Sequence, residues 1–259
     1  MAYTTILTEL ADGVLTITLN RPDTLNAFND TMIFETMAAL KEASRDEAVR
    51  CVRLTGAGRG FSSGQDLREV PNREGTIGDH MRHTYNRLIL QMVGLAKPIL
   101  GAINGVAAGA GCGIALATDL RICSDQASFL QVFSKRGLVP DNGSTWLLPR
   151  LVGYARAYEM AVEAEKISAA QALEWGLVNR VVPHEQLGEI SLAWARQIAA
   201  GPTLAYGLTK RAMLKGLTMD LESALAYEAH MQDLAGASAD SQEAIQAFLE
   251  KRAPTFKGH

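Results

Sequence analysis

A single carboxylate in a turn is the residue of this chain best placed for proton chemistry. Asp141 is the only acidic side chain between Asp125 and Glu159, and it lies in the turn-rich segment Gly137-Leu-Val-Pro-Asp-Asn-Gly-Ser144. A lone carboxylate beside a pocket of backbone N–H groups could move one proton on a carbonyl compound without a metal. The side chain could equally cap a helix that begins near Ser144, because Pro-Asp-Asn-Gly is a strong turn sequence.

A segment of small residues, Asn104-Gly-Val-Ala-Ala-Gly-Ala-Gly-Cys-Gly113, could supply the backbone donors. It follows an expected strand and opens an expected helix, whose first N–H groups could bind an anion. Its glycines could instead serve helix–strand packing. A dinucleotide site is disfavoured, because the spacing is GxGxG rather than GxGxxG and no fitting acidic residue follows about 20 residues on.

A second loop, Phe61-Ser-Ser-Gly-Gln-Asp-Leu67, could add another donor. It follows an expected buried strand, at the end where ligands bind in α/β sheets. Gly64 would allow a backbone geometry that points the N–H of Gln65 inward. The loop could also be an ordinary surface turn, and the nearby arginines could be either solvated charges or phosphate ligands.

Composition disfavours several other functions. The net charge of the 259 residues is −3, which gives no general attraction to nucleic acid. No apolar run is long enough for a transmembrane helix and no secretory signal is seen, so we expect a cytoplasmic protein. His80 and His83 could share a helix face, but no carboxylate-rich segment accompanies them and we expect no metal. The three cysteines lack a CxxC pair, which predicts buried or free thiols.

The elements that must position these residues alternate between strand and helix through the first half of the chain, which favours an α/β fold. Hydrophobic patterns and turn signals predict six strands, at Ile6–Leu10, Val14–Leu19, Val52–Thr55, Ile99–Ile103, Leu120–Cys123 and Val178–Val182. The expected helices are Asn29 to about Ala43, Asp79–Leu95, Ala110–Ala117, Ala172–Trp175 after the capping box Ser168–Gln171, Glu185–Ala199, Pro202–Gly216, Leu221–Gly236 and Asp240–Lys251.

The C-terminal part is predicted to be wholly helical. Its apolar positions Leu221, Leu225, Met231 and Leu234 must cover either the core or a neighbouring subunit. We therefore expect a core over residues 1–195 and a helical oligomerisation region over residues 196–259.

Several segments together resemble the crotonase (enoyl-CoA hydratase/isomerase) superfamily over nearly the full chain. They are Leu19–Ala27 (LNRPDTLNA), Leu54–Gly58 (LTGAG), Phe61–Leu67 (FSSGQDL), Lys97-Pro98, Ile103–Gly111 (INGVAAGAG), Asp119–Ile122 (DLRI), Leu148–Gly153 (LPRLVG) and Ala172–Val178 (ALEWGLV). The resemblance implies a spiral of ββα units, a C-terminal helical trimerisation region and acyl-CoA thioester substrates. It also implies a homotrimer or a hexamer formed as a dimer of trimers.

The resemblance further implies an oxyanion hole for the thioester oxygen, with the backbone N–H groups of Gln65 and Ala110 as its two donors. Contacts to CoA would fall at Gln65, Asp66, Leu67 and Arg68. Further contacts are expected at Arg21, at Phe133 in the acyl pocket, and at Lys251 or Lys257 of a neighbouring subunit. No cofactor is expected, since coenzyme A is part of the substrate.

Departures from the family pattern bear on the activity. Hydratases that the chain resembles use two glutamates, and these positions hold Gly113 and Phe133 here. Asp141 instead stands where similar isomerases carry their base, and Phe133–Arg150 looks most like the ring-1,2-epoxyphenylacetyl-CoA isomerases of phenylacetate breakdown, which also shift double bonds. Dehalogenases of 4-chlorobenzoyl-CoA carry a nucleophilic aspartate at this position, paired with a tryptophan where Phe133 stands.

The expected reaction is therefore double-bond migration, or rearrangement of a ring epoxide, through an enolate and with Asp141 as proton carrier. An apolar pocket containing Phe133 and Trp146 would raise the pKa of Asp141 toward a useful value. Three alternatives stay open: hydration by water held at Asp141, nucleophilic attack by Asp141 as in dehalogenation or thioester hydrolysis, and a non-catalytic CoA-binding or RNA-binding role.

Overall fold

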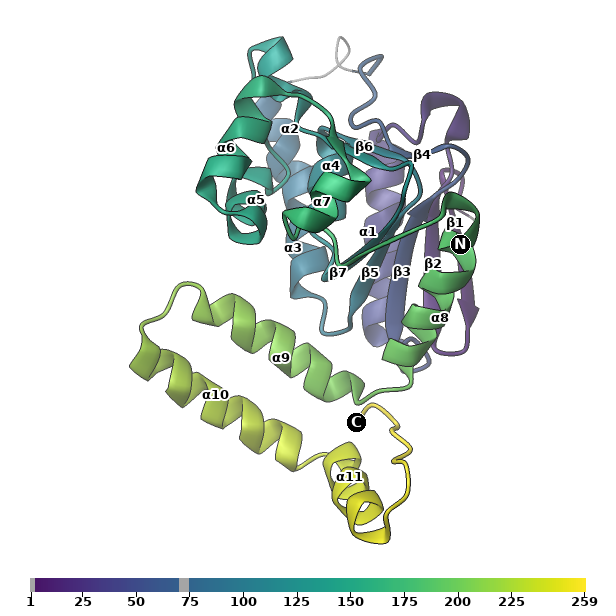
Figure 1. The fold of residues 1–259 in the computed structure, drawn as a ribbon, viewed down its shortest axis with the longest axis vertical. Helices are drawn as coiled ribbons and strands as arrows, with labels where there is room; N and C mark the ends of the chain where they lie inside the picture. Colours follow the sequence, from purple (N-terminus) through teal and green to yellow (C-terminus); the bar gives the residue numbers. More distant parts are fainter. Residues whose placement is uncertain (1–2, 70–74) are drawn as a thin grey trace.

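Two β-sheets form the centre of the molecule and helices cover them, with three further helices extending from the core (Figure 1). The structure is a computed structural model that describes residues 3–69 and 75–259. Among these residues, no helix is long and apolar enough to cross a membrane. The alternation of strand and helix seen in the sequence is thus organised around two layers of sheet.

The larger sheet begins with a β-hairpin whose turn residues, Asp12 and Gly13, both have positive φ angles of 52° and 76°, as a two-residue hairpin turn requires. Beyond this antiparallel pair all neighbouring strands run parallel. In spatial order the strands are β1 (Ile6–Ala11), β2 (Val14–Leu19), β3 (Cys51–Gly56), β5 (Ile99–Ile103), β7 (Leu120–Ser124) and β10 (Arg180–Val182). All six predicted strands are confirmed, with small changes of bounds.

The smaller sheet has four short strands that the sequence analysis missed. In spatial order they are β4 (Gly60–Ser62), β6 (Val106–Ala108), β8 (Ser128–Leu130) and β9 (Ile167–Ser168). Strands β3, β5 and β7 of the larger sheet are each followed along the chain by one of these strands, namely β4, β6 and β8. This repeat of two strands and a helical segment confirms the expected spiral of ββα units.

Helices pack on the two sheets and connect their strands. The first, α1, begins where Asn29 accepts a hydrogen bond from the N–H of Met32 at 2.9 Å, which confirms the expected cap. Helix α1 spans Asp30–Arg45, and further helices are α4 (Ala110–Leu116), α5 (Ser144–Val152), α6 (Tyr154–Glu163), α7 (Ala169–Glu174) and α8 (Leu187–Ala199). Every residue of α4 is buried.

The expected helix Asp79–Leu95 is wrong as a single element. The structure has α2 (Ile77–His83) and α3 (Tyr85–Gly94), separated by Thr84 with φ −121° and ψ −91°. The start of α2 is fixed by a capping box, in which Thr76 and Asp79 bond to each other's backbone N–H. The break turns α2 away from the axis of α3, and both helices contribute to the site described below.

The last core helix, α8, packs against the larger sheet through a buried face of small and apolar side chains, among them Leu187 and Ala195. The expected boundary between residues 195 and 196 falls inside this helix. After it come α9 (Thr203–Gly216), α10 (Leu221–Gly236) and α11 (Ala239–Glu250), which lie outside the sheets (Figure 1).

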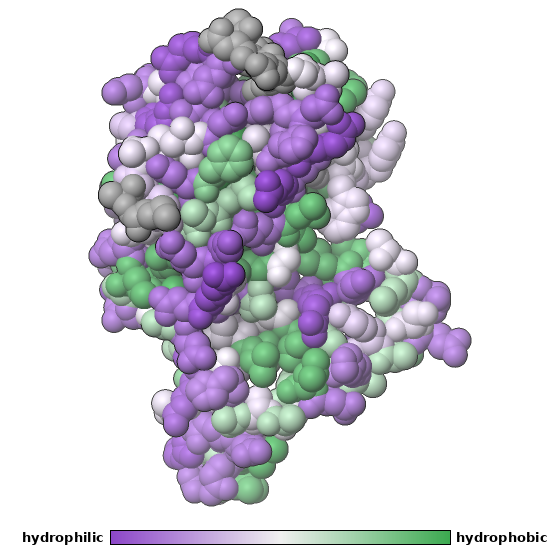
Figure 2. Space-filling model, turned by 180° about the vertical axis from the view of Figure 1, so that it is seen from behind, coloured by the Kyte–Doolittle hydropathy of each residue, from purple (hydrophilic) through white to green (hydrophobic). Residues whose placement is uncertain are grey.

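The C-terminal helices expose many large apolar side chains. Figure 2 shows green, hydrophobic residues over the lower part of one face, where these helices lie. The most exposed are Met213 (70%), Leu221 (75%), Leu225 (55%), Phe248 (82%) and Leu249 (70%). They are not covered within one chain, as expected of a region that meets other subunits, although association itself stays a prediction.

Candidate active site

The loop after β4 is held by Phe28, which lies just before α1. The N–H of Phe28 donates to the carbonyl of Gly64 at 2.7 Å, and the N–H of Asp66 donates to the carbonyl of Phe28 at 2.8 Å. In this short parallel bridge the neighbours of Gln65 both bond to Phe28. The peptide groups of Gln65 itself therefore face the other side of the loop.

Gly64 brings this loop against the start of α4. Its φ is +99°, and a Cβ atom there would lie 2.7 Å from the carbonyl oxygen of Ala108 and 3.4 Å from the nitrogen of Ala110. A side chain would therefore be strained and would push the two segments apart. As the first residue of α4, Ala110 has no acceptor for its N–H within the helix. The two predicted donors, Gln65 and Ala110, are thus brought to one place.

The glycines inside α4 have a different role, which is close packing. A Cβ at Gly111 would lie 2.6 Å from the Cβ and the carbonyl oxygen of Ser62. A Cβ at Gly113 would lie 2.7 Å from the Cβ of Asn142 and 2.9 Å from its carbonyl oxygen. The packing alternative is therefore confirmed for these two glycines. Position 113, where a hydratase glutamate was expected, is closed by Asn142.

Asp141 uses its backbone, not its side chain, to start α5. Its carbonyl accepts from the N–H of Ser144 at 2.9 Å, while the helix cap is Gly143 in a left-handed conformation with no side-chain cap bond. The alternative in which the Asp141 carboxylate caps the helix is therefore wrong. Its Oδ1 instead accepts from Nδ2 of Asn142 at 2.6 Å.

Asp141 lines a hollow of about 290 Å³. The wall on one side comes from α2 and α3, and that on the other from the turn before α5. The lining residues are Ile77, Met81, Asn86, Leu138, Val139, Pro140, Asp141, Asn142, Gly143 and Thr145. Burial raises the pKa of Asp141 from 3.8 to about 6, because the apolar surroundings disfavour the charged form.

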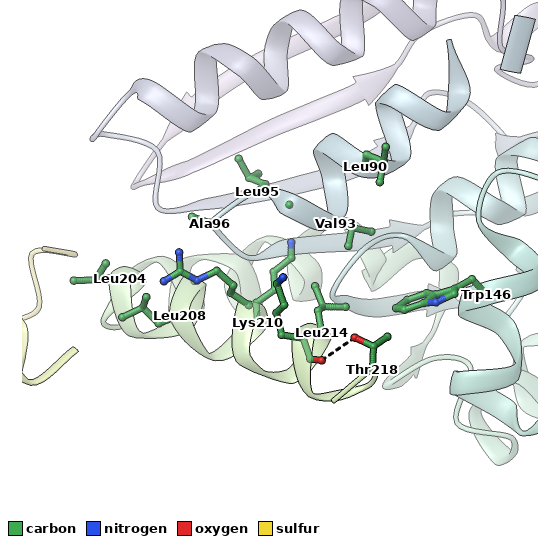
Figure 3. Close-up of a pocket in the computed structure, with 14 residues that line it drawn as sticks. Leu90, Val93, Leu95, Ala96, Trp146, Leu204, Leu208, Lys210, Leu214 and Thr218 are labelled. Carbon is green, nitrogen blue, oxygen red and sulfur yellow. Dashed lines mark hydrogen bonds between the residues drawn. The ribbon is translucent and has the colours of Figure 1, made fainter. Parts of the chain in front are cut away.

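The hollow lacks the two aromatic residues that the sequence analysis placed in it. Trp146 lies at one end of a separate cleft of about 550 Å³ between the core and α9, beyond Leu214 and Thr218 (Figure 3). Phe133 is buried, and the tip of its ring lies 3.9 Å from the Cβ position of Gly109, near the start of α4. Neither aromatic residue lines the hollow. The apolar walls come from α2 and the turn before Asp141.

The other predicted substrate residues near this loop form a network within the chain. Asp66 is buried, and its Oδ2 pairs with NH2 of Arg68 at 2.7 Å and NH2 of Arg21 at 2.8 Å. These two guanidinium groups hold the pKa of Asp66 well below its usual range. The side chain of Arg68 is 69% exposed and that of Arg21 20%. Leu67 is exposed beside them.

Lys251 directly follows α11 and Lys257 is two residues from the last residue, and both α11 and the C-terminus lie apart from α4 (Figure 1). Lys251 ends α11 in a left-handed conformation, and the backbone N–H of Lys257 donates to Asp240 at 2.6 Å. Both were expected to act from a neighbouring subunit. Their part in substrate binding therefore stays a prediction.

Two of the histidines contact oxygen atoms of the chain, and the cysteines form no disulfide bond. Nε2 of His80 lies 2.7 Å from a carboxylate oxygen of Asp30, and Nδ1 of His83 lies 2.7 Å from a carbonyl oxygen of its own helix. Among residues 3–69 and 75–259 no three His, Cys, Asp or Glu side chains gather as metal ligands. All three cysteines are buried and free, as predicted.

Sequence reasoning missed Asn142 and the wall that α2 contributes. The wall follows from the break at Thr84, which no hydrophobic pattern shows. One signal was available, since Thr76 and Asp79 form the S/T-x-x-D/E spacing that marks a helix start. Asn142 could be read from the sequence only as a turn residue, because its neighbour Gly113 is 29 positions away.

Comparison with known proteins agrees with this architecture. The sequence model of the family described as enoyl-CoA hydratase/isomerase matches residues 9–259. The chain is similar in structure to a putative enoyl-CoA hydratase/isomerase from Mycobacterium abscessus, with a TM-score of 0.93, 36% identity, and coverage of 98% of this chain and 100% of that one. The chain belongs to the enoyl-CoA hydratase/isomerase family, and its fold is the crotonase fold.

Relatives of the chain carry names for different activities. The chain is 45% identical to a 1,2-epoxyphenylacetyl-CoA isomerase of Escherichia coli over 98% of both chains. It is also 45% identical to a probable enoyl-CoA hydratase of Rhodobacter capsulatus over the whole of both chains. It is 40% identical to a 4-chlorobenzoyl coenzyme A dehalogenase of an Arthrobacter species, over 86% of this chain and 82% of that one.

Proposed function

We propose that this chain is an acyl-CoA isomerase that moves a double bond, or rearranges a ring epoxide, by proton transfer at Asp141. One observation carries the proposal. Among the residues that the structure describes, Asp141 has the only carboxyl group that lines the hollow, and burial raises its pKa to about 6. A base with that pKa is ionised at neutral pH and still basic enough to accept a proton.

The second acid of a hydratase has no place in this site. Position 113 has no side chain, and the room for one is taken by Asn142. Position 133 holds a buried phenylalanine, which carries no proton to exchange. A two-carboxylate addition of water is therefore disfavoured, whereas a proton shuttle needs one carboxylate that can reach both carbons.

The proposed reaction begins with the thioester oxygen on the N–H groups of Gln65 and Ala110. Asp141 removes a proton from C2 of a 3-enoyl thioester, and the electron pair is delocalised over the carbonyl oxygen and C4 as a dienolate. The same carboxyl group returns the proton to C4, leaving the double bond between C2 and C3. Each backbone donor is expected to contribute about 2.7 to 4 kcal/mol to transition-state stabilisation.

Several further assignments belong to this proposal. CoA would lie against the loop that carries Asp66, Leu67 and Arg68, where Arg68 is exposed and able to meet a phosphate. No cofactor other than the substrate's own CoA enters the chemistry. The exposed apolar faces of α9–α11 support a homotrimer or a dimer of trimers. A cytoplasmic location stays a prediction.

The location of label in the product tests the reaction. 3-Hexenoyl-CoA is incubated with the enzyme in D₂O, and the product is analysed by NMR and mass spectrometry. The proposal predicts 2-hexenoyl-CoA with deuterium at C4 wherever Asp141 exchanges with solvent before returning the proton. If the double bond does not migrate and C2 does not exchange its protons, double-bond migration in this substrate is refuted, and ring-epoxide substrates are tested next.

Nucleophilic use of Asp141 is the second candidate, supported by the 40% identity to a 4-chlorobenzoyl coenzyme A dehalogenase. It requires a covalent bond between Asp141 and the acyl or aryl group, and water must then cleave that bond. Single-turnover incubation with 4-chlorobenzoyl-CoA, a quench and peptide mass spectrometry would detect the adduct. An adduct on Asp141 would favour this candidate over the proton shuttle.

A further inference from the structure

Asn142 lies directly behind the proposed base and bonds to it. Its Nδ2 donates to Oδ1 of Asp141 at 2.6 Å, and the residue is only 1% exposed. Its φ is +52°, in the left-handed region that few side chains adopt readily. The backbone of the turn therefore points this amide inward, next to the carboxylate.

The place of Asn142 depends on Gly113 in α4. A Cβ at Gly113 would lie 2.7 Å from the Cβ of Asn142 and 3.2 Å from Oγ of Ser144. Behind Ser144, Nε2 of Gln131 donates to that hydroxyl at 3.2 Å and to Sγ of Cys112 at 3.4 Å. A side chain at position 113 would therefore displace Asn142 and crowd the neighbouring hydroxyl of Ser144.

Burial of this amide is unfavourable for one of its polar atoms. Oδ1 of Asn142 is buried and has no hydrogen-bond partner among the described residues, and the same is true of Oε1 of Gln131. An unsatisfied buried acceptor is unfavourable, and an apolar side chain would avoid the cost. The bond that Asn142 does make, to Asp141, therefore points to a role for the amide at the site.

We propose that Asn142 is a positioning residue for Asp141, which holds Oδ1 and leaves Oδ2 to accept and return the substrate proton. The inference rests on the proposed function, since it concerns the same carboxylate. A donor to one oxygen fixes the carboxyl plane and favours the ionised form. Asn142 acts through Asp141 and is not itself required to touch the substrate.

No other charged side chain lines the hollow among the described residues. The elements around it carry charged or titratable groups whose side chains lie outside its lining. They are Asp79, His80, Arg82 and His83 on α2, Tyr85 and Arg87 on α3, Lys135 and Arg136 before the turn, and Arg150 on α5. A shift of the pH profile on changing Asn142 would therefore report on Asp141.

Two substitutions at position 142 are compatible with the left-handed backbone, one that removes the whole side chain and one that changes only its amide group. Asn142→Gly removes the donor, and Asn142→Asp replaces it with a second carboxylate. We expect Asn142→Gly to lower kcat about tenfold with KM little changed, because a bond to a charged group is lost. The acid limb of kcat/KM should move up by about one pH unit, and further in Asn142→Asp through like-charge repulsion.

A third variant tests the geometry without touching the turn. Gly113→Ala should displace Asn142 and reproduce the shift seen in Asn142→Gly. Gly188→Ala is the matched control, because Gly188 also lies in a helix but a Cβ there meets nothing within 4 Å. Thermal unfolding of each variant shows whether it is folded before its pH profile is measured.

The outcomes separate this inference from the proposed function. If Asp141→Asn is inactive and the Asn142 variants keep the wild-type pH limb and kcat, the inference is overturned and the proposed function stands. If Asp141→Asn retains full activity, the proposed function is overturned, and the inference that rests on it is overturned as well. A raised limb in Asn142→Gly and Gly113→Ala, and not in Gly188→Ala, supports the positioning role.

Discussion

The elevated pKa of Asp141 predicts that the proposed base destabilises the folded protein at neutral pH. In the unfolded chain this carboxyl group should titrate near 3.8, whereas burial raises its folded pKa to about 6. The folded state therefore binds the proton more tightly. Stability falls as pH rises between these two values, and stays lower above pH 6.

The magnitude follows from the size of the shift. Each pKa unit corresponds to about 1.4 kcal/mol, so roughly two units give about 2 to 3 kcal/mol of lost stability above pH 6. Asp141→Asn does not titrate. The stability of Asp141→Asn relative to wild type should therefore rise by this amount between pH 4 and pH 7.5. This change corresponds to roughly 4 to 12 °C in Tm for a chain of this size.

The assay is unfolding in urea or by heating, at equal protein concentration and at several pH values. Asp23→Asn is a suitable control, since Asp23 is exposed in a short helical turn away from the hollow. A stability difference between wild type and Asp141→Asn that is the same at pH 4 and pH 7.5 would refute the reasoning. It would mean that Asp141 is as well solvated in the folded state as in the unfolded chain.

Three further predictions concern the residues around the base. Gly64→Ala should lower isomerase activity by at least about a hundredfold, measured as kcat, since its Cβ would lie 2.7 Å from the carbonyl oxygen of Ala108. Gly113→Glu combined with Phe133→Glu should give no appreciable hydration of crotonyl-CoA by absorbance, because the first position is closed. Arg21→Met should lower the urea-unfolding free energy by about 1 to 3 kcal/mol, since it leaves a buried carboxylate with one partner fewer.

The sequence was sufficient to predict the elements whose pattern is long and local. The six strands of the larger sheet and the helices α1, α9 and α10 each show periodicity or a cap within their own residues. The strands of the smaller sheet have two or three residues each, too few to show alternation. They form only because the spiral brings distant segments together, and this information is not local.

The features of the site likewise divide into those that the local sequence predicts and those that only the folded chain shows. Asp141 and Gly64 stand in segments with recognisable turn chemistry, so both were found from the sequence. The hollow that raises the pKa of Asp141 depends on α2, which is separated from α3 by the backbone at Thr84. The contact between Asn142 and Gly113 joins a turn to a helix, and only the folded chain shows that their side-chain space is shared.

The central claim is that Asp141 carries the proton. Its most direct test is the initial rate at which Asp141→Asn converts 3-hexenoyl-CoA into the conjugated 2-enoyl thioester at pH 8, measured beside wild type. The account predicts a loss of roughly a hundredfold to ten-thousandfold, the usual contribution of a general acid–base group. A variant within about tenfold of wild type would contradict it, because within residues 3–69 and 75–259 no other carboxyl group lines the hollow.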